Sequence, residues 1–280
     1  MNDGLPPPIA IGGVGGSGTR VVAALLDLLG YYLGDDLNEA ADNLWFTLLF
    51  KRRSILLEPE IDFRWLVQVF VERMSSAVNN LSAEDRRRIY LLADVDRLQH
   101  SRDWLIERAH SICDGKSSRK IGQPWAWKEP NTHIIIDRIF LIQSTLRYIH
   151  IVRNPFNMSL SNNQNQLLNW GPIFLNGDVM CEPRYSLAYW CAAHRRVMNL
   201  VRRWPERTIV IDFDELCAAP DAHYGRVAAF LGASTSDVSC DRFRALIIKP
   251  APVSPHSRID VDRFDANDLA YARELGYSVR

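Results

Sequence analysis

Short apolar runs alternate with longer amphipathic segments along most of the chain. The apolar runs predict buried strands at residues 9–11, 125–130, 147–153 and 208–213. Apolar residues that recur every three or four positions predict helices at residues 21–29, 40–51, 61–77, 83–92, 104–113, 134–140, soon after 155 through about 166, 185–203, 222–231 and 268–275. Strands that alternate with helices predict an α/β fold, in which a mostly parallel sheet lies between two layers of helices.

The segment from about residue 40 to residue 113 contains four of these predicted helices and no strand. We expect it to be a helical insertion that follows the first helix and precedes the second strand. Two interpretations fit it equally well, a lid that binds a substrate and a purely structural addition. The chain has 280 residues, which is enough for one large α/β domain. We expect a single domain over residues 1–280.

A glycine-rich loop follows the first predicted strand and leads into the first helix. Gly12, Gly13, Gly15, Gly16 and Gly18 fall within seven residues, and Ser17, Thr19 and Arg20 accompany them. This arrangement directs backbone N–H groups toward an anion at a helix N-terminus. We therefore interpret residues 12–20 as a phosphate-binding loop.

Several known loops share parts of this pattern. Gly13, Gly15 and Gly18 match the dinucleotide fingerprint G-x-G-x-x-G, although no second strand leads to the acidic residue that this fingerprint requires. The frame of an ATP-binding P-loop also fits, but Thr19 stands where its lysine should be, which argues against a kinase or an ATP hydrolase. A glycine-rich turn without a ligand is the remaining alternative.

Charged residues follow two other predicted strands, where ligands of open α/β sheets bind. Arg153 ends the most apolar strand, and Lys128 and Glu129 end the strand that contains two tryptophans. An unpaired charge at a buried strand end is costly, so Arg153 needs a partner. A phosphate group or a structural carboxylate would meet this need.

Composition excludes several classes of function. Hydrophobic residues make up 47% of the chain, charged residues 24%, and the formal net charge is zero, which gives no electrostatic reason to expect nucleic acid or an anionic membrane surface as a partner. The five cysteines contain no C-x-x-C pair, and the carboxylates lack the spacing of metal ligands, so we expect no metal. No apolar run could span a membrane, and no signal peptide begins the chain, which favours a cytoplasmic location.

Taken together, these motifs resemble the sulfotransferase superfamily, whose members transfer a sulfuryl group from 3′-phosphoadenosine 5′-phosphosulfate (PAPS). Gly15 to Arg20 is similar to the family's P-[KR]-S-G-T-[TR] loop, which holds the 5′-phosphosulfate. Arg153-Asn154-Pro155 with Ser161, eight positions after the arginine, is similar to the motif that holds the 3′-phosphate. Lys128-Glu129-Pro130 resembles a segment of tyrosylprotein-type members. Residues 209–232 are also similar to a family segment in which a strand is followed by an acidic residue and a leucine, then by a proline, and then by a helix that ends in F-L-G.

The resemblance implies a P-loop-type fold, PAPS as co-substrate and a set of site residues. The donor would be bound by Gly15, Gly16, Ser17, Gly18, Thr19, Arg20, Arg153 and Ser161. The chain departs from the family because Gly16 replaces the basic residue of the loop, so Arg20 or Lys128 would have to supply that charge. The aromatic residue that often follows the loop is Val21 here, and the C-terminal phosphate loop is missing. Ser257 and Arg258 are candidates to replace that loop.

Sulfuryl transfer needs positive groups at the leaving oxygen and a base for the acceptor, by analogy with phosphoryl transfer. We predict that Lys128 stabilises the leaving oxygen. The segment Gly34-Asp35-Asp36 resembles the G-E-E segment that carries the base of tyrosylprotein-type members, which favours Asp36. The alternatives are Asp35, Glu39, Glu129 and His133.

The predicted function is therefore PAPS-dependent transfer to an unidentified hydroxyl- or amine-bearing acceptor. A nucleotide kinase-like P-loop protein and a non-catalytic protein of the same fold are the alternatives.

Overall fold

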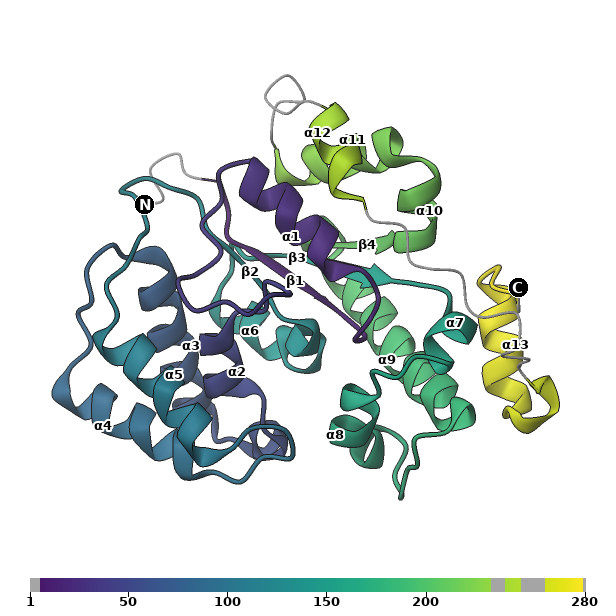
Figure 1. Cartoon of the computed structure of the whole chain (residues 1–280), viewed down its shortest axis with the longest axis horizontal. Coiled ribbons are helices and arrows are strands. Elements are labelled where there is room, and N and C mark those ends of the chain that lie inside the picture. Colours follow the sequence, from purple (N-terminus) through teal and green to yellow (C-terminus); the bar gives the residue numbers. More distant parts are fainter. Residues whose placement is uncertain (1–5, 233–239, 248–259, 279–280) are drawn as a thin grey trace. The chain divides into compact units, whose positions relative to one another are not determined.

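The computed structural model describes residues 6–232, 240–247 and 260–278. Four parallel strands form one sheet in the order β2-β1-β3-β4, and helices flank it (Figure 1). The strands are β1 (Ile9–Gly13), β2 (Ala126–Lys128), β3 (Arg147–Val152) and β4 (Thr208–Asp212). All four coincide with predicted strands to within three residues, and the predicted α/β class is confirmed.

The register of β1 and β2 fixes the position of Lys128. Ile9 pairs with Ala126 and Ile11 pairs with Lys128, and the N–H of Glu129 donates to the carbonyl of Ile11 at 3.1 Å. All five residues of β1 are buried, as the continuous apolar run predicts for a strand covered on both faces. The carboxyl end of β2 is therefore held by the neighbouring strand up to the lysine itself.

The chain divides into two compact units, of which the first contains residues 1–11 and 22–148 and the second residues 12–21 and 149–280. The first unit contains most of α1 (Thr19–Leu28). Its other helices are α2 (Leu44–Phe50), α3 (Glu60–Ser75), α4 (Ala83–Leu91), α5 (Arg102–Asp114) and α6 (Ile136–Ile142). The single domain expected from the chain length stays a prediction.

An aromatic core joins the helices of the first unit to β2. The ring of Phe70 meets those of Phe46 and Trp127 edge to face, at centroid distances of 5.7 Å and 5.2 Å. Such geometry is favourable beyond the burial of the rings. At the surface, Ser82 and Asp85 form a capping box at the start of α4.

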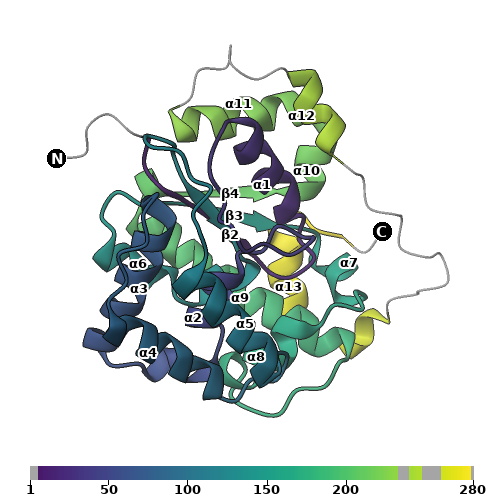
Figure 2. The same cartoon turned by 60° about the vertical axis from the view of Figure 1, so that its left-hand side comes forward.

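The helices of the second unit pack around one long helix. This helix, α9, contacts α7, α8 and α13, and Figure 2 shows the four helices close together. Phe156, Trp190 and Phe264 belong to the buried cluster between them. The helices of this unit are α7 (Pro155–Ser159), α8 (Asn165–Phe174), α9 (Pro183–Arg203), α10 (Phe213–Ala218), α11 (Pro220–Leu231), α12 (Cys240–Leu246) and α13 (Ala266–Glu274).

Two predicted helix boundaries were wrong, and two helices were not predicted. The helix predicted through about residue 166 ends at Ser159, because side chains in residues 161–164 bond to the backbone and form a turn instead. Helices α8 and α12 were both missed. The helix predicted over 40–51 begins only at Leu44, because the side chain of Asn43 accepts the N–H of Phe46 as an N-cap.

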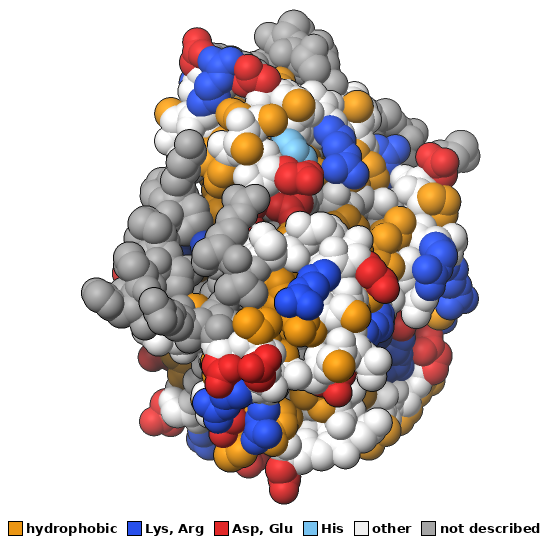
Figure 3. Space-filling model, turned by 90° about the vertical axis from the view of Figure 1, so that its right-hand side faces the viewer, with side chains coloured by type: hydrophobic (Ala, Val, Ile, Leu, Met, Phe, Trp, Pro, Cys, Tyr) orange, Lys and Arg blue, Asp and Glu red, His pale blue; other side chains and the backbone are white. Residues whose placement is uncertain are grey.

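The surface carries charges of both signs. Figure 3 shows Lys and Arg side chains intermixed with Asp and Glu on the face that it presents. Such mixing is in keeping with the zero net charge of the chain. Within the described residues, no helix has both the length and the apolar character that a membrane span requires.

Candidate active site

The glycine loop has a backbone conformation that depends on glycine at two positions. Gly16 has φ +89° and Gly18 has φ +93°, which is the left-handed region. A Cβ on Gly18 would lie 2.3 Å from the ring of Phe213, the first residue of α10. The loop therefore needs glycine at 18 for conformation and for close approach, as the sequence pattern suggested.

Ser17 and the start of α1 supply unused hydrogen-bonding groups to this loop. Ser17 is fully buried, and its hydroxyl has no hydrogen-bond partner. Thr19 and Arg20 begin α1, and the first N–H groups of a helix lack partners within the helix. A buried hydroxyl without a partner beside free backbone donors fits an anion that both would bind.

Arg153 lies directly after β3, and its side chain reaches the glycine loop. One of its terminal nitrogens, Nη1, donates to the carbonyl of Gly16 at 3.3 Å, and its Nε lies 3.8 Å from a carboxylate oxygen of Asp214. The ion pair is too long for a hydrogen bond. Arginine has five N–H donors, so donors remain for an anionic group such as phosphate.

Ser161, in the turn after α7, and Gln166, the second residue of α8, both approach the loop. Ser161 Oγ is 3.9 Å from the Cβ position of Gly16, and Gln166 Nε2 donates to the carbonyl of Gly13 at 3.1 Å. The structure therefore brings Arg153 and Ser161 to one side of the loop that contains Ser17. Gln166 was not predicted, and its burial behind a polar turn gave no sequence signal.

Arg20 and Arg258 are the other basic residues predicted to bind the donor. The side chain of Arg20 is exposed at the start of α1. Arg258, like Ser257, lies outside the described residues. Their predicted contacts with the donor stay predictions.

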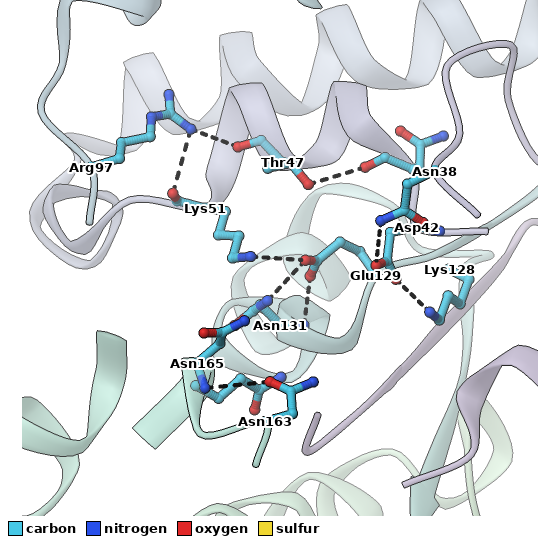
Figure 4. Close-up of polar contacts among 12 residues, drawn as sticks. Asn38, Asp42, Thr47, Lys51, Arg97, Lys128, Glu129, Asn131, Asn163 and Asn165 are labelled. Carbon is cyan, nitrogen blue, oxygen red and sulfur yellow. Dashed lines mark hydrogen bonds and ion pairs between the residues drawn. The ribbon is translucent and has the colours of Figure 1, made fainter. Parts of the chain in front are cut away.

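In the first unit, Lys128 is buried beside a carboxylate (Figure 4). Its Nζ forms an ion pair with Asp42 Oδ1 and donates to the carbonyl of Ala40 at 3.0 Å. The Lys128 side chain is 4% exposed and that of Asp42 is 20% exposed. A buried ion pair of this kind depends on both partners, because removal of either one would leave an uncompensated buried charge.

The loop before α2 is built to present Asp42. The side-chain amide of Asn38 accepts the N–H groups of Ala40 and Asp42 at 3.0 Å and 2.8 Å, and it donates to Asp42 Oδ2 at 2.9 Å. Ala41 has φ +60°, an unusual value for a residue with a Cβ. This local structure places the Ala40 carbonyl and the Asp42 carboxylate on the same ammonium group.

Comparison with protein families identifies this set of motifs. The model described as "Sulfotransferase family" matches residues 7–237, which is most of the chain. The chain belongs to the sulfotransferase family. No curated protein gives a significant match to the sequence.

Solved sulfotransferase structures are similar to this chain over almost their whole length, at low identity. The sulfotransferase domain of the Synechococcus PCC 7002 olefin synthase is 16% identical, with a TM-score of 0.49, and the match covers 100% of this chain and 98% of that one. A sulfotransferase from Alicyclobacillus acidocaldarius is also 16% identical, with a TM-score of 0.49 and coverage of 98% and 97%. These values are too low to transfer any residue's role.

The predicted bases of this sulfotransferase are engaged with other groups. Asp36 Oδ2 lies 3.1 Å from Arg108 Nε, and Asp35 accepts the N–H of Ser118. Burial raises the pKa of Asp36, while Ser111 and Arg108 oppose the rise. Glu39 is exposed.

Glu129 has a structural partner at each oxygen. Oε2 accepts the backbone N–H of Asn131 at 2.5 Å, Oε1 accepts its side-chain amide at 2.8 Å, and Lys51 Nζ lies 4.0 Å from Oε1. Burial raises the pKa of Glu129 against the opposing charge of Lys51. His133 is also buried.

The carboxylate that contacts Lys128 is that of Asp42, a residue that the sequence analysis did not name as a site residue.

Proposed function

We propose that this sulfotransferase transfers a sulfuryl group from PAPS to a hydroxyl or amine acceptor. The family model supports the reaction class, and the geometry of the glycine loop supports the donor. The observation that carries the proposal is the convergence of the Ser17 hydroxyl, the Arg153 guanidinium and Ser161 on one loop. Two anionic groups on one nucleotide would use all three.

In this proposal the chain binds both phosphate groups of the donor. The N–H groups of Gly16, Gly18 and Thr19 and the hydroxyl of Ser17 bind the 5′ side, whereas the Ser17 N–H already donates to the carbonyl of Val14 at 3.0 Å. Arg153 and Ser161 bind the 3′-phosphate. Donors fixed in advance stabilise charge that develops in a loose transition state, without reorganisation during the reaction. The donor supplies the activated sulfuryl group.

Lys128 is our candidate for the cation that stabilises the leaving oxygen, and Asp42 is its carboxylate partner in the structure. Asp36 and Glu129 stay candidates for the base that removes the acceptor proton. The helical segment 40–113 stays a candidate for the acceptor-binding lid. These assignments rest on the sequence resemblance.

Calorimetric titration with adenosine 3′,5′-bisphosphate, the product that PAPS leaves behind, tests the donor. The wild-type protein should bind it, and Arg153→Ala should lose measurable binding, because a charged hydrogen-bond partner of the phosphate is removed. Arg203→Ala, which removes an arginine from the end of α9, is the control for loss of one positive charge. Equal affinity of wild type and Arg153→Ala would contradict the proposal.

Two alternatives predict different ligands or products. A kinase-like protein should be stabilised more by ATP with Mg²⁺ than by the bisphosphate in a thermal-shift assay. A non-catalytic member of the family should bind the bisphosphate but release no product from labelled PAPS with a pool of hydroxyl and amine acceptors. Gly16, in place of the usual basic residue, keeps the second alternative open.

A further inference from the structure

The turn between α7 and α8 places a second amide side chain over the glycine loop. In Asn163, the side-chain nitrogen Nδ2 lies 3.6 Å and the oxygen Oδ1 3.8 Å from the Cβ position of Gly15. Both residues belong to the second unit. Asn163 therefore lies against the centre of the loop, between the points where Gln166 and Arg153 contact it.

The hydrogen bonds of Asn163 leave its amide nitrogen available. Its backbone N–H donates to Ser161 Oγ at 3.1 Å, and its Oδ1 accepts the N–H of Asn165, the first residue of α8, at 3.4 Å (Figure 4). Because Oδ1 accepts a bond from the backbone, the opposite side of the amide is Nδ2, a donor. The amide group lies beside Gly15 with both its nitrogen and its oxygen within 4 Å, and the nitrogen is the atom whose hydrogen-bonding capacity the protein does not use.

The backbone bond from Asn163 also determines what Ser161 can do. An oxygen that accepts the N–H of Asn163 keeps its own O–H free to donate elsewhere. The Asn163 amide and the Ser161 hydroxyl are therefore two donors beside Gly15 and Gly16, the part of the loop that Arg153 also contacts.

We infer that Asn163 is an additional donor-binding residue, whose Nδ2 donates to an oxygen of the 5′-phosphate of PAPS, the group that adenosine 3′,5′-bisphosphate retains. This inference rests on the proposed function. A side chain with an exposed amide donor at this position lets the loop bind an anion without a basic residue at position 16. The chain thereby gains a contact that the P-[KR]-S-G-T pattern does not contain.

A structural role for Asn163 gives the opposite order of effects from a ligand-binding role. If Asn163 only caps α8, Asn163→Asp keeps the acceptor oxygen and should be tolerated, whereas Asn163→Ala should lose stability. If its amide binds the anion, Asn163→Asp replaces a donor by a negative charge and should be the more harmful change. Asn162, its exposed neighbour, provides Asn162→Asp as a matched control for the added charge.

The experiment is calorimetric titration of the four proteins with adenosine 3′,5′-bisphosphate, together with their melting temperatures. We expect affinity to fall about tenfold in Asn163→Ala, as for loss of one hydrogen bond to a charged group, and further in Asn163→Asp. Asn162→Asp should stay within about threefold of wild type, since exposed charges at a distance are screened.

The outcomes separate the inference from the function on which it rests. If wild type does not bind the bisphosphate, the proposed donor is wrong. If wild type binds and Asn163→Asp binds as well as Asn162→Asp, the inference about Asn163 is wrong and the proposed donor stands. A loss of affinity in Asn163→Ala alone, with a lower melting temperature, would assign Asn163 a capping role and also overturn the inference.

Discussion

Replacement of Gly18 by alanine tests whether the glycine loop is held against α10 by close contact. The new Cβ would lie 2.3 Å from the Phe213 ring, a distance at which one of the two must move. The ring is buried, with 4% of its surface exposed, so it has little space to move into. Gly30→Ala is the matched control, because Gly30 has a similar φ of +81° and nothing within 4 Å of its Cβ position.

The expected losses differ by the steric contribution. Both variants place alanine in the left-handed region, which costs about 1–2 kcal/mol. Only Gly18→Ala adds overpacking, which typically costs about 1–3 kcal/mol. We therefore expect a decrease in the free energy of unfolding of about 2–5 kcal/mol for Gly18→Ala and about 1–2 kcal/mol for Gly30→Ala, measured by urea denaturation.

A double-mutant cycle identifies the contact itself. Phe213→Leu removes ring atoms beside the loop, so it should recover about 1 kcal/mol or more of the loss when combined with Gly18→Ala. Affinity for adenosine 3′,5′-bisphosphate should fall in Gly18→Ala and recover in part in the double variant. Equal losses for Gly18→Ala and Gly30→Ala, or additive effects in the cycle, would refute the reasoning.

Three further predictions concern buried polar groups. Asp42→Ala leaves the buried Lys128 ammonium without its carboxylate and should cost about 3 kcal/mol by urea denaturation; adding Lys128→Met should recover most of it, and no recovery would contradict the pairing. Gln166→Leu removes the donor to the buried Gly13 carbonyl and should cost about 1–3 kcal/mol, whereas an unchanged unfolding midpoint would speak against that bond. Burial lowers the pKa of His194 to about 4, so between pH 6.5 and pH 4 this histidine is protonated in the unfolded chain but not in the folded one. The free energy of unfolding should therefore fall as the pH drops from about 6.5 to about 4. This pH dependence should weaken in His194→Gln, and identical pH profiles for the two proteins would contradict the prediction.

The strands and their ends were predictable because their signals are local. Each strand is a short apolar run, and the parallel sheet follows from the alternation with helices. Because ligand groups collect at the carboxyl ends of such strands, the sequence indicated Lys128 and Arg153 as candidates before any coordinates. Arg153 and Ser161 both lie near Gly16 of the glycine loop, and their role in binding the donor stays a prediction.

The carboxylate beside Lys128 was not predictable, because its position depends on the shape of a turn. Asp35 and Asp36 follow a glycine and match a family segment, so the sequence directs attention to them. Asp42 reaches Lys128 only because Asn38 bonds to the backbone of the turn and Ala41 takes a positive φ. The sequence gives no sign that an alanine takes a positive φ, since positive φ values are typical of glycine and asparagine. The same limit explains the break after α7, where side chains compete with the helix for backbone bonds.

The absence of a basic residue at position 16 of the glycine loop has a physical counterpart in the structure. Gly16 takes φ +89°, so any side chain there would be strained even though only Ser161 Oγ lies within 4 Å of its Cβ position. Its carbonyl instead accepts a bond from Arg153, a residue on a different strand end. Arg153, which the proposal assigns to the 3′-phosphate, is thus a positive charge that contacts the loop from outside it. If that charge serves the donor, the loop needs only backbone and hydroxyl groups of its own, and Arg153 is the residue whose loss the loop cannot compensate.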